Sequence, residues 1–378
     1  MWARPDYRRL PWWWCALSGF LTVLGWLAVF SATADLDPDG GWGREATLQA
    51  LWWLIGVLAW LCAIHIAPAW WRAVAWPAAL AGTALMLAML ALAGTPLVPR
   101  IKGQANWIVI GQLRFQPVEF VKLATVMACA ALASAPHFSA RSLVHCAGLL
   151  LVAGIPAAII AREDLGSALT LGPMALAILL VAGMRWHWLL ALLLGVALSV
   201  AAAYALLPRE GPKAYQWRRL DAFLRPEQYA LAEAYQTERA KHAIGSGQWL
   251  GKGWMQGEQN RLGWVPEKHT DLIFAVIGEE GGFLVSALCV ALFVIWCWAG
   301  LAAAAHAPSR WGTCFIVGFV GLVGGQAAIN LAVALGLMPV TGVTLPFVSY
   351  GGSSLVACWL GLGICVSLHA TRQSAAGR

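Results

Sequence analysis

The sequence predicts an all-α polytopic membrane protein, and three observations carry this prediction. Of its 378 residues 60% are hydrophobic and only 11% are charged. The mean hydropathy is +0.68. The apolar residues are gathered into runs of roughly 20, the length that an α-helix needs to cross a bilayer. These properties exclude an ordinary soluble domain. We predict one integral-membrane domain over 1–378, with about ten transmembrane helices and one large extracytoplasmic loop at 208–270.

Ten apolar runs are long enough, or nearly so, to span a membrane. They cover 12–32, 46–66, 73–93, 116–135, 142–160, 165–183, 186–207, 271–298, 311–336 and 346–369. The first follows Arg8-Arg9 and ends at Ala32-Thr33-Ala34, as a signal peptide would. Because its apolar run exceeds the roughly 7–15 residues of a signal core, we predict an uncleaved first helix.

The basic residues of the short loops predict that both termini face the cytoplasm, since Lys and Arg gather on that side. With this orientation the inside segments contain one acidic residue, Asp6, and nine arginines: Arg4, Arg8, Arg9, Arg72, Arg141, Arg185, Arg310, Arg372 and Arg378. The opposite short loops contain more acidic than basic residues. The long loop 208–270 is then extracytoplasmic.

The cysteines and the net charge argue against three features: disulfide bonds, a zinc site and nucleic-acid binding. All nine cysteines lie in apolar runs and none forms a CxxC pair, so we expect packing thiols, with neither disulfides nor a zinc site. No metal site is predicted from the residues. The net charge of +7 arises largely from the inside loops and the loop 208–270, so it does not argue for nucleic acid.

The long loop contains a glycine-rich stretch, Gly245 to Gly257, that invites comparison with a nucleotide-binding loop. The spacing before Gly251-Lys252 is wrong, no Ser or Thr follows the lysine, and no strand precedes it. We expect a flexible lid or a close backbone contact instead. The stretch around 228–243 is typical of a solvated amphipathic helix.

Ionisable residues crowd the point where this loop meets the next apolar run. Glu267, Lys268, His269 and Asp271 precede the run, and Glu280 lies inside it. A carboxylate at a membrane entrance is partly desolvated, so its pKa can be tuned, and it can meet a substrate from water or lipid. The alternative is structural: Thr270 or Asp271 caps the helix that follows.

A second polar group lies at the fourth apolar run. Glu119 and Lys122 are three residues apart on one helical face, so they form either a mutually neutralising ion pair or a polar wall for a phosphate-bearing ligand. Arg114 and Lys102 nearby favour an anionic ligand. Asp164 either caps the sixth helix, by accepting hydrogen bonds from its free N–H groups, or has a functional role.

The connection from Met338 to Ser354 carries no charge, and its Pro and Gly residues break the helix. The freed backbone groups must find partners within protein or a cavity. We expect either a substrate-facing backbone site or a tight re-entrant turn.

Together these segments resemble the SEDS family (shape, elongation, division and sporulation). The matching segments occur in family order over nearly the whole chain: Lys102-Gly…Trp107…Gly111…Arg114-Phe-Gln-Pro-Val-Glu119…Lys122, Asp164-Leu-Gly166, Ala243-Ile-Gly-Ser-Gly247…Gly251-Lys-Gly253, Pro266-Glu-Lys-His-Thr-Asp271…Phe274-Ala-Val-Ile-Gly-Glu-Glu280, Asn330 and Leu345-Pro-Phe-Val-Ser-Tyr-Gly-Gly-Ser-Ser354.

The resemblance implies a ten-helix peptidoglycan glycosyltransferase that polymerises lipid II with inversion at the anomeric carbon. Asp271 is the residue it implies for catalysis, as general base. The expected substrate-binding residues are Lys122, Glu119, Arg114, Trp107, Lys102, Arg218, His269, Glu267, Glu280 and Ser349. The wording Ile-Gly-Ser-Gly…Gly-Lys-Gly-Trp favours the elongation (RodA) type, acting in rod-shape maintenance, over the division (FtsW) type.

The resemblance also implies a bacterial cytoplasmic (inner) membrane location. The expected partners are lipid II, the nascent glycan strand, a class B penicillin-binding protein transpeptidase and other membrane proteins of the elongation complex. No cofactor is required by the residues, although a divalent cation (Mg²⁺ or Mn²⁺) can assist the departing pyrophosphate.

Several positions depart from the family pattern: Asn106, Val118, Arg162-Glu163 and Glu238-Arg239-Ala240. These departures keep open the hypothesis of a catalytically inactive protein, and two rival functions stand beside the enzyme. Broken helices and buried charge also mark a lipid II flippase or transporter. An inactive scaffold for cell-wall enzymes is the third hypothesis.

Overall fold

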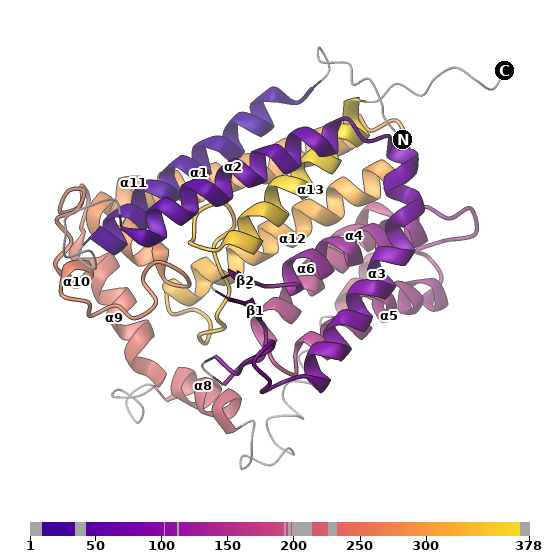
Figure 1. Ribbon diagram of the computed structural model, residues 1–378. Helices are drawn as coiled ribbons and strands as arrows, with labels where there is room; N and C mark the ends of the chain where they lie inside the picture. The colour runs from indigo at the N-terminus through magenta and orange to yellow at the C-terminus, as the bar shows by residue number, and fades with distance from the viewer. Residues whose placement is uncertain are drawn as a thin grey trace.

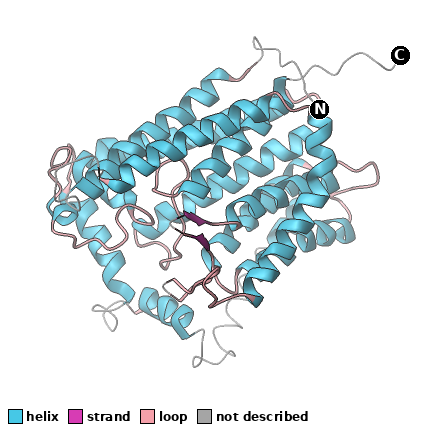
Figure 2. Cartoon of the chain, in the orientation of Figure 1, coloured by secondary structure: helices cyan, strands magenta, loops and turns pink. Residues whose placement is uncertain are grey.

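The computed structural model describes residues 10–34, 43–101, 103–111, 113–192, 194–195, 198, 214–225 and 233–370. Nearly all described elements are helices (Figures 1 and 2). They are α1 (Trp12–Thr33), α2 (Arg44–Ile64), α3 (Pro68–Ala91), α4 (Val118–Ala133), α5 (Leu143–Ile160), α6 (Leu165–Val181), α8 (Ala214–Leu224), α9 (Glu233–Ser246), α10 (Glu258–Arg261), α11 (Ile273–Ala305), α12 (Arg310–Ala334) and α13 (Gly352–Ala370).

The predicted class, an all-α polytopic membrane protein, is confirmed. Within the described residues, seven helices are long and apolar enough to cross a membrane: α1, α2, α3, α5, α11, α12 and α13. At 16 and 17 residues, α4 and α6 are shorter. Nine of the ten predicted spans thus coincide with a helix, and the remaining one, 186–207, lies mostly outside the described residues.

The centre of the bundle is formed by α12, which packs against α4, α6, α11 and α13. Small residues let α12 approach α6 closely, as glycines do between membrane helices. A Cβ at Gly321 would lie 2.7 Å from the Ala177 side chain, and one at Gly325 2.5 Å from that of Pro173. On the other side, α13 packs chiefly against α2, and α1 against α11.

A short antiparallel hairpin interrupts the helices and was not predicted. Its strands are β1 (Ile108–Ile110) and β2 (Leu113–Phe115), with Val109 opposite Arg114. Gly111 adopts a positive φ of 62° at the turn, which suits glycine because it lacks a Cβ. The hairpin leads directly into α4, near the middle of the molecule in Figure 1.

Several predicted boundaries were wrong, and α3 begins at Pro68 rather than at residue 73. The last helix begins at Gly352, because residues 346–351 belong to the preceding connection. The predicted span 271–298 is a longer helix, α11, which is broken at Gly282 (φ 66°, ψ −165°). In the long loop, α9 overlaps the helix predicted at 228–243, of which residues up to 232 lie outside the described part, and α8 was not anticipated.

Candidate functional site

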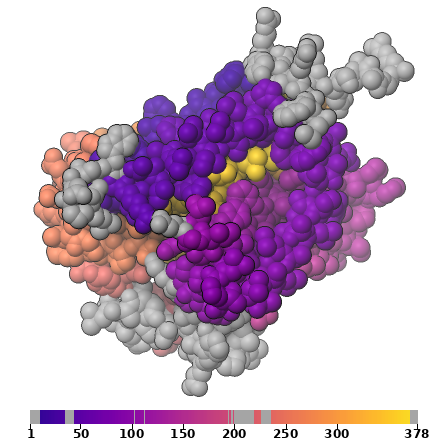
Figure 3. All heavy atoms as spheres, viewed as in Figure 1, coloured from indigo at the N-terminus to yellow at the C-terminus, as the bar shows by residue number. Residues whose placement is uncertain are grey.

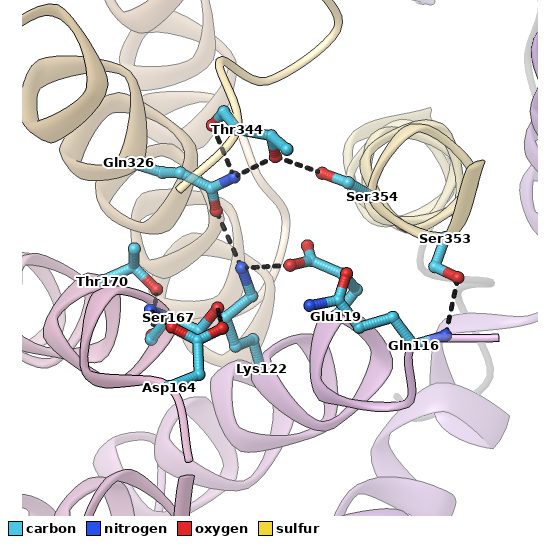
Figure 4. A network of polar contacts seen from close by, with 10 residues as sticks. All are labelled: Gln116, Glu119, Lys122, Asp164, Ser167, Thr170, Gln326, Thr344, Ser353 and Ser354. Carbon is cyan, nitrogen blue, oxygen red and sulfur yellow. Dashed lines mark hydrogen bonds and ion pairs between the residues drawn. The ribbon is translucent and has the colours of Figure 1, made fainter. Parts of the chain in front are cut away.

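A buried ion pair joins Glu119 and Lys122 on α4 (Figure 4). Lys122 Nζ lies 2.8 Å from Glu119 Oε1, and the two side chains are 2% and 8% exposed. The ion-pair alternative of the sequence is therefore confirmed. Isolated buried charge is costly, so this pair depends on further hydrogen bonds to complete its shell.

Gln326 of α12 supplies one of those hydrogen bonds. Lys122 Nζ donates to Gln326 Oε1 at 2.8 Å. The Gln326 amide nitrogen donates to the carbonyl and the hydroxyl of Thr344, at 3.0 and 3.3 Å. The hydroxyl of Thr344 in turn lies 3.2 Å from that of Ser354 at the start of α13. Figure 4 shows this chain running from α4 through α12 to the connection before α13.

Asp164 is the N-cap of α6, as the structural alternative predicted. Its carboxylate accepts from the backbone N–H of Ser167 at 2.9 Å and from the Ser167 hydroxyl at 2.7 Å. The neighbouring Glu163, one of the departures from the family pattern, accepts from the backbone N–H of Ala105 at 2.9 Å. Glu163 thus anchors the segment that leads to the hairpin.

The uncharged connection 339–351 is held by amide side chains on both sides. Gln49 of α2 donates to the carbonyl of Ser349 at 3.0 Å. On the other side, the amide nitrogen of Asn330 donates to the carbonyl of Val343 at 2.7 Å. Two backbone carbonyls of this broken segment thus find their partners within protein, as membrane depth requires.

The same amide holds Asp271. Asn330 Nδ2 donates to the Asp271 carbonyl at 2.7 Å, and Asp271 Oδ2 lies 3.7 Å from where a Cβ at Gly342 would stand. Asp271 is partly exposed, whereas Glu119, Asp164, Glu279 and Glu280 are buried. The structure therefore places Asp271 beside the connection 339–351, with part of its surface exposed. The N-cap position of α11 belongs to Leu272, without a side-chain cap.

The residues before Asp271 pack against the same connection. The Tyr350 backbone N–H donates to the His269 carbonyl at 2.9 Å, and the two rings lie 5.8 Å apart. Burial raises the pKa of the Tyr350 phenol above its ordinary value. Glu267 accepts a hydrogen bond from the Thr270 hydroxyl at 3.2 Å. These contacts fix the backbone on the N-terminal side of Asp271.

Part of the long loop is inserted into the break in α11. The carbonyls of Glu279 and Glu280 accept from the backbone N–H groups of Lys252 and Gly253, at 3.0 and 3.1 Å. The N–H groups of the next two residues after Gly282, at positions 283 and 284, donate to carbonyls at positions 248 and 249. The segment 247–253 thus provides the backbone partners that the broken helix lacks.

Glycines make this insertion possible. A Cβ at Gly247 would overlap the carbonyl of Gly278, and one at Gly251 would overlap that of Glu280. The expectation of a close backbone contact in the glycine-rich stretch is confirmed.

The acidic pair beneath the insertion is fully engaged. Glu279 accepts from the backbone N–H groups of Gln259 and Asn260, at 2.8 and 3.0 Å, and from Lys252 Nζ at 3.0 Å. Burial alone lowers the pKa of Lys252, but the hydrogen bond and charge of Glu279, together with those of Glu258, outweigh it and raise the pKa. Glu280 accepts from the N–H of Met255 at 3.1 Å. The pair anchors the long loop to α11.

The remaining predicted residues are less closely grouped. Arg114 is exposed on β2, and Trp107 precedes β1. Ser349 is buried in the connection, where its hydroxyl accepts from the Leu345 N–H at 2.8 Å. Lys102 lies outside the described residues, as does the side chain of Arg218 on α8.

Sequence reasoning missed three residues that organise the site. Gln326, Gln49 and Asn260 each hold a segment distant in sequence by hydrogen bonds. For Gln49 and Gln326 the available signal was an isolated amide within an apolar run, because such groups usually bond between helices in a membrane. Asn260 lies in the polar loop 208–270, where no such signal exists.

Arg239, another departure from the family pattern, is held by aromatic rings. Its guanidinium lies 5.0 Å from the Tyr235 ring centre and 5.2 Å from that of Trp264, which suits cation–π attraction. It connects α9 to the start of the segment that contains Asp271.

The molecular surface has a hollow between α2 and α3 (Figure 3). In Figure 3 a hollow separates the atoms coloured as α2 from those coloured as α3 and the segment after it, and yellow atoms of the C-terminal region are visible within it.

The fold and site define a polytopic membrane protein with a partly exposed aspartate held against the uncharged connection 339–351, and with a buried ion pair on α4. The chain belongs to the family of cell cycle proteins that comprises FtsW, RodA and SpoVE, whose model matches residues 11–374.

The relatives cover most of the chain. This chain is 34% identical over 274 residues to the peptidoglycan glycosyltransferase MrdB of Escherichia coli (strain K12), and the match covers 72% of each chain. It is 31% identical over 359 residues to the probable peptidoglycan glycosyltransferase FtsW of Trichlorobacter lovleyi, covering 93% of this chain and 90% of that one. A solved chain from a peptidoglycan synthase complex of polymerisation and crosslinking is 30% identical, with a TM-score of 0.77, over 95% of this chain and 97% of that chain.

Proposed function

We propose that this chain joins lipid II units into glycan strands and that Asp271 is its general base. The enzyme class, a peptidoglycan glycosyltransferase, rests on the family and on the names of its relatives. The observation that supports the role of Asp271 is its position: a partly exposed carboxylate whose backbone is held by Asn330 against the fixed connection 339–351.

The reaction needs one inverting displacement. The acceptor 4-hydroxyl oxygen attacks the anomeric carbon of the donor sugar, and the bond from that carbon to the pyrophosphate oxygen breaks. Asp271 takes the hydroxyl proton, and undecaprenyl pyrophosphate leaves. A positioned base contributes typically 10²–10⁴-fold to such a step. The α-linked donor gives a β-linked product.

The departing pyrophosphate requires positive charge. Arg114 is exposed on the hairpin and can reach an anion. Lys122 is buried and already paired with Glu119, so in this function it acts through the field of the pair rather than by direct contact. Lys102 and Arg218 are further candidates, and a divalent cation, Mg²⁺ or Mn²⁺, can add to them.

The hollow in Figure 3 supports an approach from the membrane. Leu51, Leu54 and Leu58 on α2 are exposed, and an apolar surface of this kind suits an isoprenoid chain. In this proposal the protein lies in the bacterial inner membrane with both termini in the cytoplasm, and the long loop 208–270 covers the outer, catalytic side.

The biological role proposed is cell elongation, with a class B penicillin-binding protein as partner. The relative in a complex of polymerisation and crosslinking supports such a partner. Relatives named MrdB and FtsW are of similar identity, so division is the alternative role. Restoration of rod shape in cells depleted of their elongation polymerase, without restoration of septation in cells depleted of their division polymerase, is the expected result; the reverse pattern would assign division.

The activity is tested with purified protein and lipid II in detergent. Wild-type chain, with and without its class B partner, is expected to form glycan strands, and Asp271→Asn is expected to lose at least 100-fold in rate. Glu238→Gln, which alters an exposed ion pair on α9, is the matched control and should keep full activity.

The same assay separates the rivals. A flippase needs a two-sided membrane, so strand formation in detergent excludes transport as the sole function. Failure of wild-type protein to polymerise even with its partner would favour the scaffold. Near wild-type activity of Asp271→Asn would remove Asp271 from the role of base while leaving the enzyme class intact.

A further inference from the structure

Two buried amides lie one helical turn apart on α12. Gln326 and Asn330 are 3% and 1% exposed, and their spacing of four residues puts them on the same face of the helix. Between Gly318 and Ala334 they are the only side chains of α12 that can form hydrogen bonds. Burying an amide without partners is costly, so each must be matched to specific groups.

The partners of Gln326 determine how its amide is turned. A lysine ammonium can only donate, so the oxygen of Gln326 faces Lys122 and the nitrogen faces Thr344. A single side chain thus connects the buried ion pair of α4 to the connection 339–351.

Asn330 holds Val343, the residue of that connection directly before Thr344. Its nitrogen donates at 2.7 Å both to the Val343 carbonyl and to the Asp271 carbonyl. Neighbouring residues, Val343 and Thr344, are therefore each held by one amide of α12. The Asn330 oxygen is buried and has no hydrogen-bond partner among the described residues, so the nitrogen makes the contacts that hold Asp271.

We propose that Gln326 is a positioning residue for catalysis: by tying the connection 339–351 to the Glu119–Lys122 pair, it sets the place where Asp271 meets the acceptor hydroxyl. The links run from Lys122 through Gln326 to Thr344, then from Val343 through Asn330 to Asp271. This inference rests on the proposed role of Asp271 as base. A displacement of about 1 Å at a reacting group can cost about 100-fold in rate.

Two substitutions at Gln326 separate positioning from charge compensation. Gln326→Leu removes both contacts. Gln326→Glu keeps an oxygen for Lys122 but loses the N–H groups that Thr344 accepts. If Gln326 acts by holding the connection, both variants lower kcat about 100-fold and leave KM for lipid II within about twofold. If it only compensates the charge of Lys122, Gln326→Glu keeps wild-type kcat, and the proposal is overturned.

A matched control accounts for lost stability. Ser367→Ala removes a partly buried hydrogen bond, from the Ser367 hydroxyl to the Ile66 carbonyl at 2.7 Å, at the far end of α13. It is expected to keep kcat within about twofold. A loss in Gln326→Leu no larger than that in Ser367→Ala overturns the proposal.

Thr344→Val keeps the inference testable if the Gln326 variants do not fold. It removes the hydroxyl that Gln326 contacts at 3.3 Å, together with that hydroxyl's 3.2 Å contact to Ser354, and leaves the Thr344 carbonyl. We expect about a fivefold lower kcat, the effect of losing the weaker of the two contacts to Gln326, and an unchanged kcat overturns the proposal.

Asp271→Asn runs in the same assay and separates the two failures. An active Asp271→Asn overturns the proposed base and, with it, this inference. An inactive Asp271→Asn beside fully active Gln326 variants overturns only the role of Gln326.

Discussion

The hydroxyl of Ser31 in α1 donates a 2.6 Å hydrogen bond to the carboxylate of Glu280 in α11, although 249 residues separate them in the chain. The amide of Asn260 donates to the same carboxylate oxygen at 2.9 Å and to the Ser31 carbonyl at 3.2 Å. Three segments thus meet at one carboxylate. The acidic pair Glu279-Glu280 therefore holds α1, α10 and α11 together.

Loss of the Glu279 carboxylate should destabilise the protein. Glu279→Ala leaves two backbone N–H groups without their acceptor and leaves Lys252 with only the exposed carboxylate of Glu258 as a partner. Removing one partner of a buried charged group costs about 3–5 kcal/mol, which lowers the melting temperature in detergent by roughly 10 °C. Glu258→Gln, whose side chain is 75% exposed, is the control and should change it little. Equal melting temperatures for the two variants would contradict the anchoring role.

The insertion of the glycine-rich segment should depend on individual glycines. At Gly247 a methyl group would overlap the carbonyl of Gly278, whereas nothing lies within 4 Å of a Cβ at Gly245. We expect Gly247→Ala to open the loop to limited proteolysis near residues 247–257. Gly245→Ala, two residues earlier, should resist cleavage as the wild type does. Similar cleavage of both variants would show that close approach is not what requires glycine here.

The losses of stability caused by substituting the two members of the buried ion pair should not be additive. Lys122→Met leaves Glu119 buried without its cation, and Glu119→Gln leaves the ammonium of Lys122 without its counter-charge. Each single change is expected to cost about 3 kcal/mol or more, and the double change less than either alone. Thermal unfolding of the three variants tests this. The exposed pair Glu238–Lys241, 39% and 44% exposed, serves as the comparison, with at most about 1 kcal/mol expected. Additive losses at the buried pair would be inconsistent with the prediction.

The contact between Lys252 and Glu279 should survive at neutral and mildly alkaline pH. The pKa of Lys252 is raised on folding, so its contribution to stability is complete below the ordinary value of 10.5 and is lost as the pH rises through the folded value. The difference in melting temperature between wild type and Lys252→Met, measured from about pH 8 to pH 11.5, should be constant at first and shrink at the alkaline end. A difference that shrinks below about pH 9 would disagree with a raised pKa.

Features that depend on neighbouring residues could be predicted from the sequence. The spans follow from apolar runs, since length and hydropathy are local properties. The pair Glu119–Lys122 and the cap at Asp164 involve residues three apart, so helical spacing alone brings their groups together. Each was predicted with an alternative, and in both cases the structural alternative is the one observed.

Features that depend on contacts between distant segments could not be predicted from the sequence. Lys122 and Gln326 are 204 residues apart, and no local spacing relates them. The acidic pair at 279–280 gave a signal of function because charge within an apolar run is unusual, but its partners come from the loop and from α1. The hairpin was hidden for a different reason: two strands of three residues are too short to show an alternating pattern.

The broken helix α11 depends on a segment that is synthesised before it. Residues 247–253 leave the ribosome ahead of residues 279–284, whose backbone groups they satisfy. The nascent chain therefore already contains the partners of the break when α11 enters the membrane. An unpaired backbone group in lipid costs several kcal/mol. Because of the order of these segments along the chain, the backbone groups at the break have their partners available as soon as the interrupted helix is inserted.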